Sequence, residues 1–292
     1  MKSTKLAPSR APESSPAELC PHCAGKVNPL KRECPKCGKD VGFPNVRLAG
    51  VPAEVAALEA RFAEACAECD RAGTRSELDS LEECAQKDSQ IVIAMRGLQA
   101  RSFLSDPNQL YQGYEGMVGS NARLPAPPEN DAERCEVAGK LFGITAKEIR
   151  YGALSLDGRG LANYGSVFLS LDQVAVSHRT SFIDENPFTL LPKLRTTPGR
   201  PIEKGRRSTW GNRGQLVCCK LSAKLKAGDT RSEFEKLLLF VGKTRQEDDF
   251  VEAHIYGTFN PSAVSHVNFA SAPTKDLSAH DKRTIEKLAK KP

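Results

Sequence analysis

Two closely spaced cysteine pairs constrain this chain more than any other feature. In "CPHCAGKVNPLKRECPKCG", Cys20 and Cys23 form the first pair, and Cys34 and Cys37 form the second after ten intervening residues. Each Cys-x-x-Cys pair forms a tight turn that directs two thiolates at one point, and four thiolates complete the closed tetrahedral shell of a structural Zn²⁺. The spacing therefore predicts one structural zinc ion in a cysteine module over residues 17–48.

The cysteine module resembles a zinc ribbon. A closed four-thiolate shell leaves no open position for catalysis, and the metal supplies stability that so small a module cannot gain from apolar burial. His22 lies inside the first turn and is not counted as a ligand, because the cysteines already fill the shell. Five basic residues suit contact with nucleic acid, although zinc ribbons bind proteins about as readily: Lys26, Lys31, Arg32, Lys36 and Lys39.

The remaining six of the ten cysteines favour reduced thiols over a disulfide scaffold, because the chain is large and shows no export signal. Cys66 and Cys69 are three residues apart on a predicted amphipathic helix, and Cys84 lies on the next one. Buried free thiols explain these three, with a second metal site as the alternative. No ligand spacing links the others, Cys135, Cys218 and Cys219.

Charge is distributed unevenly within the net charge of +6. Residues 52–90 carry ten acidic and four basic residues, whereas residues 195–245 carry thirteen basic and four acidic residues. Basic regions attract polyanions such as nucleic acid or phosphate-bearing cofactors. The alternative is a solvated surface on which opposite charges pair.

The sequence predicts a soluble, cytoplasmic protein without membrane association. No apolar run approaches the ~20 residues needed to span a bilayer. The first residues, "MKSTKLAPSRAPESSPAE", lack the apolar stretch of a secretory signal. The sequence does not indicate an oligomeric state.

Periodicity predicts mostly helices in the first half and mixed elements in the second. Helices are expected at about 52–72, 74–87, 89–104, 131–142, 208–225 and 231–242, and strands at about 149–155, 166–171, 173–178 and 249–256. The expected buried residues of the third helix are Ile91, Val92, Met95, Leu98 and Phe103. Ser208 and Ser232 are expected as N-caps of the last two helices.

The fold class is therefore α+β, with an N-terminal zinc ribbon, a helical middle segment and a C-terminal mixed domain built on a small, largely antiparallel sheet. The expected domains are a disordered tail at 1–16, the cysteine module, a helical segment at 49–145, an α+β domain carrying any catalysis at 146–272, and a basic tail at 273–292.

The stretch "DDFVEAHIYGTF" alternates in the manner of a strand. Val251, Ala253 and Ile255 suit a core, while Glu252 and His254 share the opposite face with aromatic residues. This face is interpreted either as part of an active site or as an ordinary polar strand face.

Three short motifs resemble those of ADP-ribosyltransferases, over at most residues 147–270: "IRYGAL", "GLANYG" and "FVEAHIYG". The resemblance implies that NAD is the cofactor, with Arg150 or Tyr151 meeting NAD, Gly152 allowing close backbone approach and Tyr164 stacking on nicotinamide. It further implies catalytic roles for Glu252, which would stabilise an oxocarbenium-like transition state, and His254, which would support it.

The match to this family is partial. The usual Ser-Thr-Ser segment is absent, with "HRTSF" as a loose substitute, and the common Glu-x-Glu is replaced by Glu252-x-His254. Arg179 within "HRTSF" is assigned to cofactor or phosphate binding, with a surface ion pair near a capped helix as the alternative.

Two functions follow. The first is an ADP-ribosyltransferase-like enzyme that uses NAD to modify a protein or nucleic-acid acceptor, as a toxin or defence effector does. The second is a non-catalytic zinc-ribbon module that binds nucleic acid or a protein partner. A concave pocket shared by Glu252, Tyr151 and Tyr164 favours the enzyme, and a solvent-exposed Glu252 favours the binding module.

Overall fold

The structure is a computed structural model that describes residues 18–28, 30–113, 128–186, 189–190, 192, 202–271 and 275–289. The predicted disordered tail, residues 1–16, lies outside this part of the chain. Among the helices that are described, none combines the length and apolar character needed to cross a bilayer.

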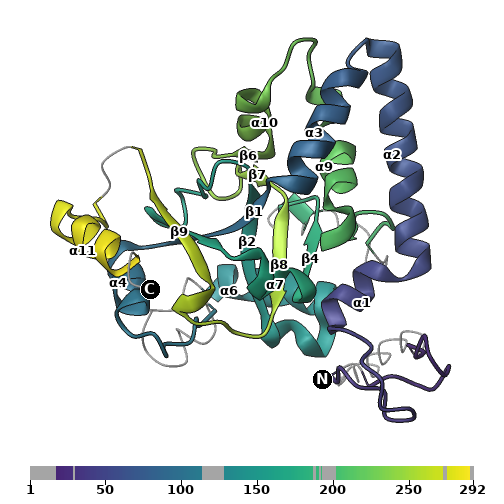
Figure 1. The fold of residues 1–292 in the computed structure, drawn as a ribbon, viewed down its shortest axis with the longest axis horizontal. Helices are drawn as coiled ribbons and strands as arrows, with labels where there is room; N and C mark the ends of the chain where they lie inside the picture. Colours follow the sequence, from purple (N-terminus) through teal and green to yellow (C-terminus); the bar gives the residue numbers. More distant parts are fainter. Residues whose placement is uncertain are drawn as a thin grey trace, which may run out of the picture.

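A seven-stranded sheet organises the molecule (Figure 1). Its strand order is β5-β4-β8-β2-β1-β3-β9, and every neighbouring pair is antiparallel. The strands are β1 Gln90–Met95, β2 Ile149–Ser155, β3 Val167–Leu171, β4 Thr180–Ile183, β5 Arg207–Thr209, β8 Glu252–Tyr256 and β9 Val264–Phe269. A separate two-residue pair joins β6 Leu239–Phe240 to β7 Asp249–Phe250. The expected antiparallel sheet is confirmed.

Helices pack on both faces of this sheet. They are α1 Pro44–Gly50, α2 Pro52–Ala72, α3 Arg75–Lys87, α4 Gly97–Ser105, α6 Pro128–Phe142, α7 Gln173–Val176, α9 Arg213–Leu221, α10 Arg231–Leu238 and α11 Ala279–Ala289. Short 3₁₀ helices connect them: η1 Gly143–Glu148, η2 Ser177–Arg179, η3 Trp210–Asn212, η4 Ser222–Lys224 and η5 Pro261–Ala263. The prediction of a helix over 52–72 is confirmed, since Pro52 begins α2 and Gly73 ends it in the left-handed conformation.

The main core lies between one sheet face and the helices α2, α3, α9 and α10. Leu58, Leu78 and Leu216 from the helices meet Leu154 and Ile255 from the strands. A smaller cluster on the opposite face joins α6 to the sheet through Phe142, Ile149 and Ile183. The sheet is thus covered on both faces around β2 and β8.

The predicted helix at 89–104 is wrong in its first half, which forms β1 and is followed by α4. The sequence "QIVIAM" is rich in β-branched residues, and β1 lies between β2 and β3 with both faces covered, so it shows no polar alternation. Ile91, Val92, Met95 and Phe103 are buried as expected, but Leu98 is 64% exposed. The helical middle segment therefore contributes a strand to the centre of the sheet, while the predicted domain boundaries stay predictions.

The predicted strand at 173–178 is also wrong. Asp172 accepts a hydrogen bond from the backbone N–H of Val174 at 2.9 Å, and this N-cap starts the short helix α7. The strand comes later, as β4, in the segment that contains Phe182.

The two expected serine N-caps are not formed. Ser208 lies buried within β5, and Thr209 closes a capping box with Asn212 instead. Thr230 rather than Ser232 caps α10. Both helices are shorter than predicted. The strand β5 occupies the start of the expected range 208–225, and β6 lies within the end of the expected range 231–242.

The predicted basic tail, residues 273–292, forms the helix α11 in its described part. Ile285 is buried against the main core, and Asp281 accepts an ion pair from Arg101 of α4 at 2.8 Å. Apolar burial therefore docks this segment on α4 and β9 despite its net positive charge.

Candidate metal centre and buried Glu–His pair

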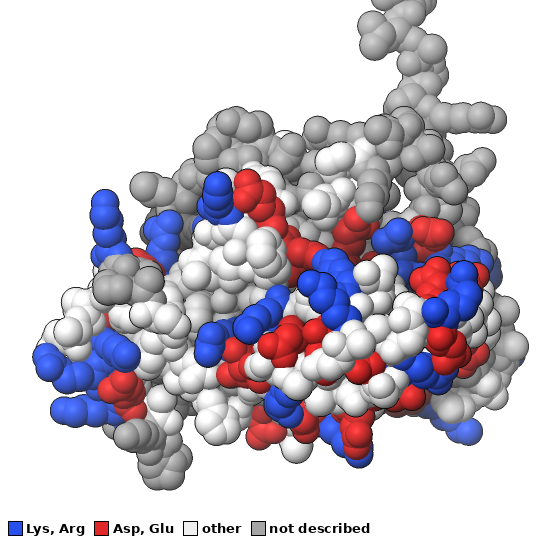
Figure 2. Space-filling view, turned by 90° about the horizontal axis from the view of Figure 1, so that it is seen from above, with Lys and Arg blue, Asp and Glu red and all other residues white. Residues whose placement is uncertain are grey.

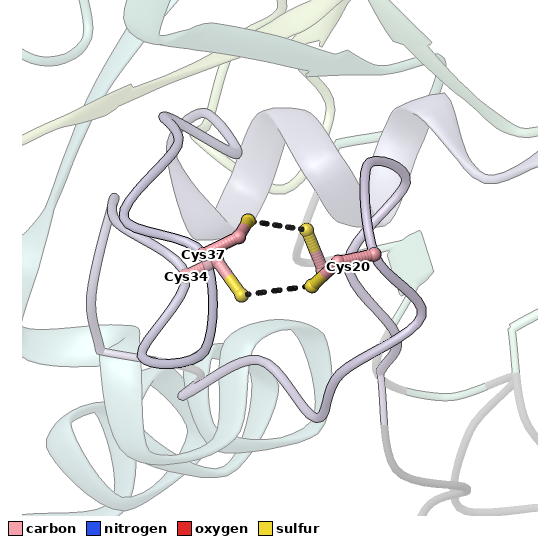
Figure 3. Close-up of side chains that lie close together, drawn as sticks. Cys20, Cys34 and Cys37 are labelled. Atoms are coloured by element: carbon pink, nitrogen blue, oxygen red, sulfur yellow. Dashed lines mark hydrogen bonds between the residues drawn. The ribbon is translucent and has the colours of Figure 1, made fainter.

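The four predicted zinc ligands converge in the structure. The Sγ atoms of Cys20 and Cys37 are 3.8 Å apart, and those of Cys23 and Cys34 are 3.6 Å apart. Tetrahedral Zn²⁺ with Zn–S bonds near 2.3 Å places its sulfur ligands about 3.8 Å from one another. The cluster therefore has the dimensions of a structural zinc site, and Figure 3 shows its thiols turned toward one another.

Backbone turns hold each pair in place. The N–H of Ala24 donates to Cys20 O at 2.9 Å, and the N–H of Gly38 donates to Cys34 O at 2.8 Å. Gly38 has a φ of 70°, a conformation that glycine adopts without steric cost. His22 lies outside the cluster, with Nε2 3.3 Å from Asp40 O. Hydrogen bonds between residues four positions apart therefore close both turns.

The thiols of the cluster differ in their readiness to ionise. The backbone N–H of Cys37 lowers the pKa of Cys34 to about 6, against the effect of desolvation. The backbone N–H of Gly25 lowers the pKa of Cys23, but desolvation and the neighbouring thiols outweigh it and raise that pKa to about 11. Accumulating negative charge opposes full ionisation, and a bound dication removes this opposition.

Arg47 joins the cysteine module to α1. Its Nε donates to Glu18 Oε1 at 2.7 Å, and its Nη1 donates to Gly42 O at 2.7 Å and to Lys31 O at 3.1 Å. One guanidinium thereby ties three points of the module to the helix that follows it.

Asn45 joins α1 to the sheet. Its Nδ2 is close to three acceptors: His254 O at 2.8 Å, Arg179 O at 3.1 Å and Ser181 Oγ at 3.2 Å. The cysteine module therefore packs, through α1, on the strand that carries Glu252 and His254. Sequence patterns gave no signal for Asn45, because its partners are more than 130 residues away.

Glu252 and His254 form a buried pair on β8. His254 Nε2 lies 2.9 Å from Glu252 Oε1, and the two residues are only 2% and 5% exposed, respectively. The Phe142 ring of α6 covers His254 edge-on, with ring centroids 4.7 Å apart. This face of β8 is consequently an interior surface, not a solvated strand face. The expected core positions Val251, Ala253 and Ile255 are buried on the other side.

Among the residues expected to bind NAD, Tyr151 lies beside the Glu252–His254 pair. It is opposite His254 in the β2–β8 register, with ring centroids 5.7 Å apart. Tyr164 packs in the adjoining cluster with Ala153, the residue opposite Glu252, and its ring is covered by the Arg245 guanidinium at 4.7 Å.

Arg150 and Gly152 lie on the other face of the sheet, because they alternate with Tyr151 along β2. Arg150 Nη1 donates to Lys147 O at 2.8 Å. A Cβ at position 152 would lie 2.7 Å from Ile91 Cγ2, so glycine here permits the close approach of β1. The structure therefore separates these two expected NAD residues from Glu252.

Arg179 is engaged by the backbone. Its Nη1 donates to Tyr256 O at 2.9 Å and to Thr258 O at 2.8 Å, which holds the chain at the end of β8. Neither the expected phosphate contact nor the alternative surface ion pair is needed to explain this side chain.

The cysteines of α2 and α3 form no second metal group within the described ranges. Burial raises the pKa of Cys66 and of Cys84, which keeps both as thiols at neutral pH. Cys69 is buried, with Sγ 3.9 Å from Ser222 O. These residues fit the interpretation as core thiols.

In the described part of the chain, two ion pairs join the acidic segment to the basic one. Glu54 of α2 pairs with Arg207 at 3.3 Å, and Asp88 pairs with Arg231 of α10. Figure 2 accordingly shows acidic and basic side chains interspersed over one face of the molecule. No uniformly basic area is seen among the described residues on this face (Figure 2).

Four lysines of the cysteine module behave differently. Lys26, Lys31, Lys36 and Lys39 are exposed, and none of them forms an ion pair within the described part of the chain. Arg32, by contrast, pairs with Asp40. The module consequently carries a set of basic side chains without acidic partners.

Neither the models of known protein families nor the curated proteins match this chain. The likeness to ADP-ribosyltransferases thus rests on the short motifs alone.

Proposed function

We propose that the protein is a zinc-stabilised binding module that contacts nucleic acid through the lysines of its cysteine module. The observation that carries this proposal is that four exposed lysines, without acidic partners in the described part of the chain, gather on one small module. In residues 195–245, by contrast, six basic side chains have acidic partners, and the exposed Lys204, Lys226 and Lys243, which have none among the described residues, lie on three separate loops. Ammonium groups without acidic partners are available to phosphates at no cost in lost ion pairs.

The structural role of zinc fits this function. A metal-bound module presents its lysines from an ordered backbone, so less conformational entropy is lost when they meet a polyanion. The contacts are ionic and carry little base specificity, because lysine binds phosphate as a point charge. Zinc, in this proposal, supports binding and takes no part in catalysis.

The first prediction concerns the triple variant Lys31→Gln, Lys36→Gln and Lys39→Gln. Each lost phosphate contact removes about one released counterion, so the slope of log K against log salt should become less steep by about 2–3. We expect affinity for a fluorescein-labelled 20-mer DNA or RNA to fall more than tenfold at low salt, measured by fluorescence anisotropy.

A matched triple variant removes the same charge from lysines that already have acidic partners: Lys87→Gln, Lys224→Gln and Lys236→Gln. Its affinity should stay within twofold of wild type. If both triple variants lost affinity equally, the loss would follow from net charge alone, and the proposal would be contradicted. Absence of binding by the wild-type protein at low salt would also contradict it.

A second candidate function is NAD-dependent ADP-ribosyl transfer. It is favoured by the meeting of Tyr151, Glu252 and His254 on one face, because a carboxylate held by an imidazole can stabilise a developing positive charge. It is disfavoured by the positions of Arg150 and Gly152 on the opposite face.

The test of this candidate is NAD consumption by the full chain with protein and nucleic-acid acceptors present. On this reading Glu252→Gln, which keeps the shape of the side chain, abolishes turnover, whereas Arg150→Gln leaves it unchanged. A wild-type protein that consumes no NAD rejects the candidate.

A further inference from the structure

A cleft of about 730 Å³, lined by several charged residues, lies away from the cysteine module, between α2, α9 and the ends of β4 and β7. Its volume is within the range of small-molecule sites, which run from roughly 300 to 1,000 Å³. The charged and polar side chains that determine its chemistry are Arg61, Glu185, Arg206, Lys220, Gln246 and Asp249. No sequence motif pointed to this combination, because it gathers five separate parts of the chain.

Two arginines in the cleft are oriented by one buried carboxylate. Arg61 Nη2 is 2.9 Å from Asp184 Oδ2, and Arg206 Nη1 is 3.4 Å from Asp184 Oδ1. Asp184 is only 4% exposed, and it lines the cleft as well.

Arg61 Nη1 also donates to Gly205 O at 2.5 Å. Arg206 also pairs with Glu185 at 3.4 Å and with Glu203 at 3.1 Å. A guanidinium has five N–H donors, so each arginine still keeps donors beyond these acceptors. A fixed pair of guanidinium groups is a strong receptor for a phosphate or carboxylate.

Lys220 adds a third cation. Its Nζ donates to Asp184 O at 2.6 Å and to Asp249 Oδ1 at 2.5 Å, which fixes the ammonium at the cleft wall. Burial opposes ionisation of Asp249, but hydrogen bonds from Lys220 and Lys224 outweigh it and lower the pKa of that carboxyl. The cleft therefore presents fixed charges of both signs at neutral pH.

The acceptors of the cleft narrow the class of ligand. Glu185 pairs with Arg206, and Asp249 pairs with Lys220 and Lys224, so both carboxylates act as acceptors beside the three cations. Gln246 adds an amide. A simple inorganic anion would use the cations and be repelled by the carboxylates. A ligand that carries hydroxyl groups next to a phosphate would use both, since carboxylates accept hydrogen bonds from sugar hydroxyls. Within the described residues these acids do not gather as a metal-ligand group.

We propose that this cleft binds a phosphorylated sugar, of the class of ribose phosphates and mononucleotides, with the phosphate on Arg61, Arg206 and Lys220 and the sugar hydroxyls on Glu185 and Asp249. This site goes beyond the proposed contact of the cysteine module with nucleic acid, since it lies on other elements and takes a small molecule.

The test is isothermal titration calorimetry of the full, zinc-loaded chain with four probes: inorganic phosphate, ribose 5-phosphate, AMP and adenosine. We expect 1:1 binding of ribose 5-phosphate and AMP, at least tenfold tighter than binding of phosphate or adenosine. Arg206→Gln should weaken ribose 5-phosphate binding more than tenfold. Glu185→Gln should reduce the advantage of ribose 5-phosphate over inorganic phosphate.

Gln246→Glu keeps the proposal testable if Arg206→Gln fails to fold, because residue 246 is exposed at the cleft. A carboxylate there should repel the phosphate and weaken ribose 5-phosphate binding about fivefold. Its matched control is Gln173→Glu, the same charge change at the exposed first residue of α7, and ribose 5-phosphate binding by this variant should stay within twofold of wild type.

Three outcomes would overturn the proposal: no binding of ribose 5-phosphate by wild type at millimolar concentration, inorganic phosphate binding as tightly as ribose 5-phosphate, or equal weakening by the two glutamate variants. The triple lysine variant of the cysteine module should bind ribose 5-phosphate like wild type. If ribose 5-phosphate does not bind in the cleft, the proposal of nucleic-acid binding by the cysteine module is unaffected. If nucleic acid does not bind, the cleft proposal is likewise unaffected.

Discussion

Replacing Cys34 with serine is expected to abolish tight zinc binding and to unfold the cysteine module while the seven-stranded sheet stays folded. The module has only a small apolar cluster of its own, made largely of its metal ligands and two valines. Structural zinc contributes about 10–16 kcal/mol of apparent binding free energy in small modules, so its loss exceeds any stability that apolar burial supplies here. The measurement is zinc per chain by elemental analysis, together with hydrogen exchange of residues 18–43.

The effect of Cys34→Ser should extend to β8 through Asn45. Once the module unfolds, α1 loses the contacts that Arg47 makes with it, and the hydrogen bond from Asn45 to His254 O weakens. Hydrogen exchange within β4 and β8 should therefore accelerate, and Asn45→Ala should produce the same change with zinc still bound.

Cys135→Ser is the matched control for this prediction, because Cys135 is exposed and lies outside the metal cluster. It should retain one zinc ion per chain and show wild-type exchange. If Cys34→Ser retained a full equivalent of zinc with unchanged exchange of residues 18–43, the assignment of the four ligands would be wrong.

Replacing His254 alone with leucine should lower the free energy of unfolding by on the order of 3–5 kcal/mol, because it removes the imidazole that Glu252 meets at 2.9 Å in the interior. Urea unfolding monitored by Trp210, the single tryptophan, measures this change.

The double variant Glu252→Leu and His254→Leu should recover most of that loss, because two apolar side chains suit an interior surface better than one unpaired carboxylate. Recovery of the free energy of unfolding would mean that the fold does not need the Glu252–His254 pair for stability. That result would strengthen the case for a functional role of the pair. A double variant as unstable as His254→Leu would assign the pair a structural role. His266→Leu, on the exposed part of β9, should change stability by less than about 0.5 kcal/mol.

Short-range patterns predicted the features that depend on neighbouring residues. The Cys-x-x-Cys turns form through hydrogen bonds that span four or five residues, so their spacing was sufficient to identify the cluster. The helix α2 was predicted with its correct bounds because Pro52 and Gly73 act locally on its two ends. The alternation of β8 likewise identified which of its residues face the main core.

The failures over α7 and the two N-caps had local causes, because short-range caps that were not predicted form at Asp172, Thr209 and Thr230. Two other failures arose where distant segments decide the outcome. The segment "QIVIAM" became a central strand because β2 and β3 flank it, and burial on both faces removed the alternation that identifies strands. The positive charge of residues 195–245 suggested a polyanion-binding surface, but the fold places Arg207 beside Glu54 and Arg231 beside Asp88.

The sequence by itself determined the metal-binding cysteines, the antiparallel character of the C-terminal sheet and the two faces of β8. Only the tertiary structure decided that Glu252 and His254 are interior, that Arg150 lies on the opposite face, and that Arg61, Arg206 and Lys220 share one cleft. The physical reason is range: turns and periodicity are fixed by residues a few positions apart, whereas burial and charge pairing depend on segments brought together only by the fold.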